Sequence, residues 1–174
     1  LSAIMIENLP FWVEITTTPS KKVSLMSEWE SKLKAIVSEV KNEDVGSMTG
    51  VPSWMMVLLQ RTLADTGKET IAQIWPNLEV FFHGGISFKP YRDQYRKIIG
   101  RDINYYEIYN ASEGFFAIQD QPGSDEMLLM LDYGIFYEFI PMDAFDPDNL
   151  QAIPLEEVEI GKNYAVVITT NSGL

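Results

Sequence analysis

The order of elements in the middle of the chain constrains the fold more than any other feature of this sequence. A strand candidate at residues 78–82 leads into the glycine turn His83-Gly84-Gly85, and a helix candidate follows over residues 90–100. A second strand candidate at residues 105–109 then leads into the turn at residues 110–114. A helix that crosses over a sheet returns the chain to the end of the sheet where the first strand began, so the next strand runs in the same direction. This order therefore predicts parallel strands with helices on their faces.

The residues before this segment predict further regular structure. Ser27 and Glu30 form a capping-box pattern at the start of a helix whose apolar positions run from Trp29 to Val40. A second helix opens at Pro52 and stops at Gly67, and because it is apolar on most sides we expect it to be buried. Short apolar runs within residues 3–15 predict strands.

After residue 119 the sequence becomes rich in strand candidates. Residues 127–131 and 135–140 predict one hairpin, and residues 157–160 and 164–169 predict another. We therefore predict an α/β fold with a partly parallel sheet flanked by helices over residues 1–120, followed by antiparallel β hairpins over residues 121–174. The chain begins at Leu1 rather than Met, and its last strand candidate runs almost to the final residue, so both ends look cut.

Composition excludes several classes of function. The formal net charge is -12, which opposes binding to nucleic acid and to anionic membranes. The absence of cysteine excludes disulfides and a thiolate nucleophile, and His83 is the single histidine. We expect His83 to be a hydrogen-bonded structural residue rather than a general base. With no apolar run near the ~18 residues that span a bilayer, we expect a cytoplasmic protein.

The ends of the predicted strands carry the residues that could perform chemistry. Gly84 and Gly85 would allow a flat ring to lie against the backbone, although a glycine pair is more often a simple tight turn. Tyr109, Ser112 and Glu113 combine an aromatic ring, a hydroxyl and a carboxylate, which suit a nucleobase, a phosphate and a magnesium ion. The alternative is a helix cap, in which Ser112 bonds backbone and Glu113 faces water.

Four separated segments, residues 50–54, 74–80, 83–85 and 109–114, resemble the auxin-responsive promoter (Gretchen Hagen three) family. That family comprises acyl-acid amido synthetases related to firefly luciferase and acyl-CoA ligases. The resemblance implies an internal fragment of the large domain of an adenylate-forming enzyme. It also implies ATP and Mg²⁺ as cofactors, and a small carboxylic acid, an amino-acid acceptor and the remainder of its own polypeptide as partners. This bacterial-type sequence departs from the plant pattern at His83 and at Asn110-Ala111, which argues against a substrate of the auxin or jasmonate type.

The resemblance implies a role for each matching residue. Tyr109 would stack on adenine, Ser112 would contact the α-phosphate, and Glu113 would coordinate magnesium, with Ser112 and Glu113 the catalytic pair. The other residues implied to contact a ligand are Gly84, Gly85 and Asn110 for the nucleotide, and Phe115, Phe116 and Ile118 for the acyl group. An aromatic strand after a turn is core at least as often as pocket wall.

The reaction implied is carboxylate adenylation followed by amide formation. This sequence holds neither the upstream phosphate loop, nor the downstream ribose-binding motif, nor the lysine of the mobile C-terminal domain that such enzymes use, so we expect no turnover from this chain alone. Two alternatives remain open. One is a non-catalytic binding or interaction module on the same fold, and the other is a thioester-forming acyl-CoA-type ligase, which shares the first half-reaction.

Overall fold

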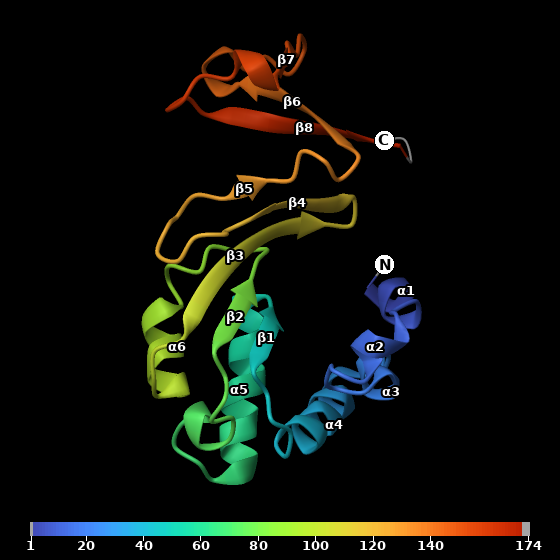
Figure 1. Ribbon diagram of the computed structural model, residues 1–174, viewed down its shortest axis with the longest axis vertical. Coiled ribbons are helices and arrows are strands. Elements are labelled where there is room, and N and C mark those ends of the chain that lie inside the picture. Colours follow the sequence, from blue (N-terminus) through green and yellow to red (C-terminus); the bar gives the residue numbers. More distant parts are fainter. Residues whose placement is uncertain (1, 172–174) are drawn as a thin grey trace.

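The computed structural model describes residues 2–171, which form helices and two separate sheets (Figure 1). The helical elements, in chain order, are α1 (Ser2–Glu7), α2 (Phe11–Glu14), α3 (Lys21–Ser24), α4 (Trp29–Val40), α5 (Pro52–Thr66), η1 (Ile71–Gln73), α6 (Arg92–Ile99), η2 (Met142–Ala144) and η3 (Leu155–Glu157). The strands are β1 (Ser47–Gly50), β2 (Val80–His83), β3 (Asn104–Ala111), β4 (Gly114–Ile118), β5 (Leu128–Leu129), β6 (Ile135–Pro141), β7 (Ile153–Pro154) and β8 (Tyr164–Thr170).

The larger sheet has the strand order β1-β2-β3-β4-β5, and the smaller sheet has the order β7-β6-β8. β1, β2 and β3 are parallel, whereas β4 and β5 join the same sheet in antiparallel pairing. The smaller sheet is antiparallel throughout. The predicted α/β class, with a partly parallel sheet and antiparallel hairpins, is confirmed. The division of domains at about residue 120 stays a prediction.

The main core lies between the parallel strands and the helices α5 and α6. Phe81 of β2, Leu59 of α5 and Tyr95 of α6 are fully buried there. The Tyr95 hydroxyl donates to the Pro52 carbonyl over 2.7 Å, which ties α6 to the first turn of α5. Burying an apolar side chain of this size contributes about 1.5–3 kcal/mol, so this cluster fixes the strands whose carboxyl ends carry the candidate residues.

The two long helices form where the sequence predicts them, with two differences. α5 ends at Gly67, which takes the left-handed conformation with φ 67° as expected of a C-terminal glycine. The cap of α4 is Glu28 rather than Ser27, because the Glu28 carboxylate accepts from the backbone N–H groups of Glu30 and Ser31. The expected burial of α5 holds for one face only.

Two residues show that the other face of α5 is open. Trp54 and Val57 are 59% and 41% exposed, and the Trp54 ring meets the Trp29 ring of α4 with centroids 5.0 Å apart. An apolar composition therefore did not require burial on every side of this helix.

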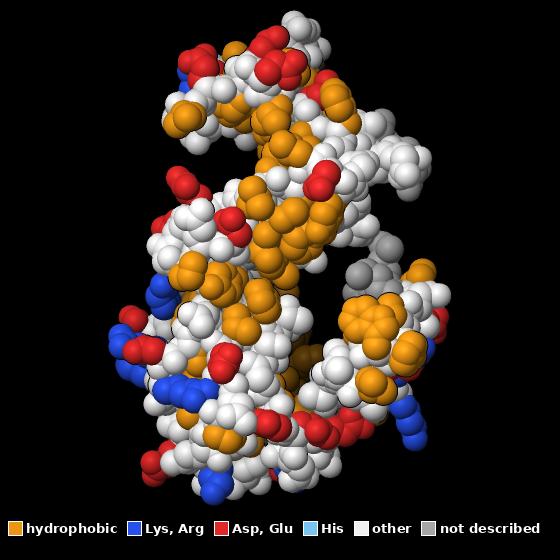
Figure 2. Space-filling view, viewed as in Figure 1, with side chains coloured by type: hydrophobic (Ala, Val, Ile, Leu, Met, Phe, Trp, Pro, Cys, Tyr) orange, Lys and Arg blue, Asp and Glu red, His pale blue; other side chains and the backbone are white. Residues whose placement is uncertain are grey.

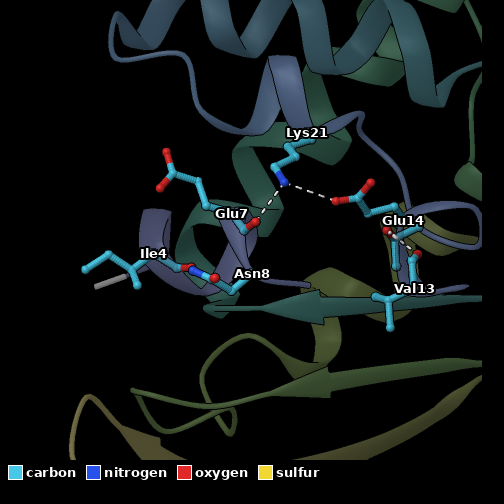
Figure 3. A network of polar contacts seen from close by, with 7 residues as sticks. Ile4, Glu7, Asn8, Val13, Glu14 and Lys21 are labelled. Carbon is cyan, nitrogen blue, oxygen red and sulfur yellow. Dashed lines mark hydrogen bonds and ion pairs between the residues drawn. The ribbon is translucent and has the colours of Figure 1, made fainter. Parts of the chain in front are cut away.

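The strands predicted within residues 3–15 are wrong, because this segment forms the short helices α1 and α2. Figure 3 shows Lys21 between them, where its Nζ donates to the Glu7 carbonyl over 2.8 Å and pairs with Glu14 over 3.1 Å. Asn8 donates back to the Ile4 carbonyl, as at a helix end. Short apolar runs are compatible with the periodicity of a helix and with that of a strand, and here the polar contacts favour the helix.

The strands beyond residue 119 pair antiparallel as predicted, but the partners predicted in both hairpins are wrong. β5 pairs with β4, and β6 pairs with β8 over seven register positions from Ile135↔Thr170 to Pro141↔Tyr164. Residues 157–160 lie in η3 and the loop after it rather than in a strand. The strand predicted over residues 164–169 forms as β8, which ends at Thr170, and residues 172–174 lie outside the described residues.

Candidate functional site

The candidate residues lie on a hairpin between two strands rather than on a strand-to-helix turn. β3 continues through Tyr109, Asn110 and Ala111, so the turn contains only Ser112 and Glu113 before β4 begins. The predicted turn over residues 110–114 is therefore too long. The helix-cap alternative is also wrong, because the element that follows Glu113 is a strand.

A bulge in this hairpin sets the direction of the aromatic side chains. Tyr109 lies opposite Ala117 and Asn110 lies opposite Phe115, which leaves Phe116 as the extra residue of β4. The Tyr109 ring meets the Phe116 ring edge-on, with centroids 5.1 Å apart, and Tyr109 remains 50% exposed. Tyr109 is thus supported on one side and open to a stacking partner on the other.

Ser112 and Glu113 are exposed at the tip of the hairpin. Within residues 2–171 neither side chain has a hydrogen-bond or ion-pair partner, so both are free for a ligand. No group of three or more His, Asp or Glu side chains in that range could hold a metal ion by itself. A single free carboxylate fits Mg²⁺ that is bound together with phosphate oxygens of a substrate, which is the usual arrangement for this ion.

The glycine turn after β2 lies beside β3, immediately before Tyr109. The register pairs His83 with Glu107, so Gly84 follows alongside Ile108. A Cβ atom on Gly84 would lie only 2.4 Å from the Ile108 carbonyl oxygen. Gly85 is exposed and has φ +81°, which favours glycine. The fold therefore brings Gly84, Gly85 and Tyr109 together at the carboxyl end of the sheet, where ligands of open α/β sheets bind.

The three candidates for the acyl site do not share one surface. The register places Phe115 and Ile118 on one face of β4, and both are half-buried. Phe116 is 4% exposed and packs in the core with Ile135, Tyr137 and Phe139. The centroid of the Phe115 ring lies 6.2 Å from that of the exposed Tyr133, a residue that no sequence pattern marks as a candidate. Contact of these residues with an acyl group stays a prediction.

His83 is buried against aromatic rings at the end of β2. Its ring stacks on Phe88 with centroids 4.2 Å apart, and it is 3% exposed. Burial, and then the nearby Arg92 charge, lower the pKa of His83 to about 4. Its Nδ1 atom has no hydrogen-bond partner among residues 2–171, so the structural role is consistent with the burial but the expected hydrogen bond at this atom is absent.

His83 makes the stability of the protein depend on pH. Its pKa in the folded state is below its ordinary value of 6.5, so the unfolded chain binds the proton more tightly and stability falls as pH decreases from about 6.5 towards 4. We expect His83→Phe, which can keep the stack on Phe88, to make this fall shallower by an amount on the order of 2 kcal/mol at pH 4.5. Urea unfolding of both proteins at pH 7 and pH 4.5 measures this, and identical pH dependences would contradict it.

Two cavities lie away from the hairpin. One of about 320 Å³ sits at the amino ends of β2 and β3, beside Leu78 and Arg101. Another of about 190 Å³ lies between α6, β3 and the loop at residues 122–125. Neither is lined by residues 109–113. Figure 2 shows hydrophobic side chains gathered on the surface over β3 and β4. We place the site on the hairpin because its side chains are unpaired and of the types that a nucleotide requires.

Two solved structures share the fold of this chain. The chain superposes on the acyl acid amido synthetase GH3.15 with a TM-score of 0.65 and 12% identity, over 90% of this chain and 37% of that one. It superposes on a 2-hydroxyisobutyryl-CoA ligase with a TM-score of 0.57 and 17% identity, over 83% of this chain and 29% of that one. At these identities the likeness shows the fold alone.

Sequence comparison then shows the family. Residues 1–103 match the model of the GH3 family N-terminal domain, and residues 128–174 match that of the GH3 family central domain. The chain belongs to the GH3 family.

Curated relatives agree with this membership. The indole-3-acetic acid-amido synthetase GH3.3 of Arabidopsis thaliana is 29% identical over 111 residues, which cover 60% of this chain and 18% of the relative. The probable indole-3-acetic acid-amido synthetase GH3.9 of Oryza sativa subsp. japonica is 31% identical over 119 residues, which cover 60% of this chain and 24% of the relative. The match thus spans about a fifth of the length of these relatives.

None of the helices within residues 2–171 combines the length and the apolar character needed to cross a membrane.

Proposed function

We propose that the protein to which this chain belongs is an ATP-dependent acyl-acid amido synthetase. In this proposal it adenylates a small carboxylic acid and then joins the acyl group to an amino acid. The observation that carries the proposal is the β3–β4 hairpin, which presents the half-exposed Tyr109 directly after Ile108, the neighbour of Gly84, and the unpaired Ser112 and Glu113 at its tip. Membership of the GH3 family and the names of the relatives support it.

The first step forms a mixed anhydride. A carboxylate oxygen of the acid attacks the α-phosphorus of ATP, the new O–P bond forms, and the bond to pyrophosphate breaks. Negative charge gathers on the α-phosphate oxygens in the transition state, where donors and cations are most effective. In the second step the amine nitrogen attacks the acyl carbon, AMP leaves, and the nitrogen loses a proton.

Each hairpin residue contacts a different part of ATP in the first step. The open side of the Tyr109 ring stacks on adenine, and the Gly84-Gly85 turn lets the base approach the backbone. Ser112 donates its hydroxyl proton to an α-phosphate oxygen, and Asn110 stands beside it on the strand. Glu113 would hold Mg²⁺, which would neutralise phosphate charge when bound. Phe115 and Ile118 contribute apolar surface near the acyl group, and Phe116 supports this strand from within the core.

A second candidate function is formation of a thioester with coenzyme A. The superposition on a 2-hydroxyisobutyryl-CoA ligase favours it, because that enzyme shares the fold and was observed with an acyl adenylate and CoA. Both candidates use the same first step, so residues 109–113 would serve either one. The family membership favours the amide-forming reaction.

The test is an ATP–pyrophosphate exchange screen over small carboxylic acids with the full-length protein. We expect exchange with at least one acid, and we expect amino acids rather than coenzyme A to consume the adenylate. No exchange with any acid would favour a binding module that has lost activity. Product formed only with coenzyme A would favour the thioester ligase.

Because the reaction draws on ATP, we place the protein in the cytoplasm, which fractionation of the source cells would test.

A further inference from the structure

We propose that Ile135 of the smaller sheet is a positioning residue for the nucleotide hairpin, and that it sets the place of the Ser112–Glu113 turn through Gly114. The inference rests on the function proposed above, because it assigns a task to a residue outside the site itself. It joins two parts of the chain that are paired in different sheets.

Gly114 has no side chain because Ile135 fills the space beside it. Gly114 follows Glu113 directly and is not among the glycines with positive φ, so its backbone does not require glycine. A Cβ atom at this position would lie 2.8 Å from Ile135 Cδ1 and 3.3 Å from Phe116 Cε1. Carbon atoms in contact normally lie about 3.5–4.0 Å apart. The backbone at the start of β4 therefore packs directly against the Ile135 side chain.

Ile135 cannot move aside freely. It is 9% exposed and packs in one cluster with Phe116, Tyr137 and Phe139. It is also the first residue of β6, the central strand of its sheet, which pairs with β8 along its whole length. A close-packed cluster passes displacement of one member to the others, so Ile135 is a fixed support rather than a loose neighbour.

β6 also supports the other side of the hairpin, where Tyr109 lies. The Tyr137 hydroxyl donates to the Met130 carbonyl over 3.3 Å, and the Met130 N–H donates to the Phe116 carbonyl over 2.8 Å. Phe116 in turn meets the Tyr109 ring. Burial raises the pKa of Tyr137, and the nearby Tyr109 phenol raises it further, which agrees with a short separation of the two side chains.

A compensating pair of substitutions tests this contact in the full-length enzyme. Gly114→Ala adds the methyl group that meets Ile135, and Ile135→Val removes Cδ1, the atom it meets most closely. We expect Gly114→Ala to raise the Mg²⁺ concentration for half-maximal ATP–pyrophosphate exchange roughly tenfold, since overpacking displaces the turn that carries Glu113. We expect the double variant to return to within about twofold of the unsubstituted enzyme, because the added and removed methyl groups exchange places.

Gly46→Ala is the matched control. Gly46 also lacks a positive φ, and a Cβ there would lie 3.8 Å from the Asn77 carbonyl oxygen, which is an ordinary contact. It should leave the Mg²⁺ dependence unchanged. If Gly114→Ala behaves like Gly46→Ala, or if the double variant is as impaired as Gly114→Ala alone, Ile135 does not position the turn.

Amide hydrogen exchange of residues 109–115 separates this inference from the proposed function. Faster exchange in Gly114→Ala and recovery in the double variant would support the contact even if the enzyme adenylates no acid. Exchange unchanged in all variants would overturn it. Absence of ATP–pyrophosphate exchange in the unsubstituted protein would overturn the proposed function alone.

Discussion

Replacement of Glu113 by alanine in the full-length enzyme is expected to lower ATP–pyrophosphate exchange by a factor on the order of a hundred or more. Glu113 is exposed, unpaired within residues 2–171, and located at the tip of the hairpin beside Ser112. Without its carboxylate, Mg²⁺ loses its proposed protein ligand, and charge on the phosphates is neutralised less well. Because the side chain has no partner in the described fold, the stability of the protein should change little.

Two further variants make this result specific. Glu113→Gln keeps the size of the side chain and removes its charge, so it should lose most of the activity as well. Glu126→Ala removes an exposed carboxylate from the loop before β5, and should leave exchange unchanged. Unchanged exchange in Glu113→Ala would falsify the assignment of this residue to the metal.

Gly84→Ala is expected to have the largest effect on stability. The added Cβ would lie 2.4 Å from the Ile108 carbonyl oxygen, and that oxygen belongs to the backbone of β3 rather than to a flexible side chain. The two strands would have to separate where β2 ends, at a cost of roughly 3 kcal/mol, which lowers Tm by about 6–12 °C in a domain of this size. Tyr109 follows Ile108, so ATP binding should weaken too.

Gly46→Ala again provides the control, and we expect its stability to stay within about 0.5 kcal/mol of the unsubstituted protein. Thermal unfolding and ATP titration of both variants distinguish two explanations for Gly84. Loss of stability together with ATP binding is expected if strand spacing requires glycine. A protein of normal Tm that no longer binds ATP would show instead that Gly84 is needed only for contact with the base.

The grouping of the candidate residues could be predicted from the sequence because they are close together in the chain. Tyr109, Ser112 and Glu113 fall within one hairpin, so their proximity depends on few backbone angles. The burial of the neighbouring side chains could not be predicted from their closeness in the sequence. Phe115, Phe116 and Ile118 look alike as an apolar run, but a bulge at Phe116 and the cluster under β6 turn Phe116 into the core. The burial of His83 under Phe88 likewise depends on packing across the turn.

The sequence by itself determined the long helices, their glycine stops at Gly67 and Gly100, and the parallel order of β2 and β3. These features depend on apolar spacing and on backbone conformations that act over a few residues. Only the tertiary structure decided that β6 pairs with β8 rather than with residues 127–131, and that the first residues of the chain are helical. The backbone of one strand can form hydrogen bonds with any other strand that buries its apolar side chains on the same face. Which two strands pair therefore depends on the packing of the whole chain.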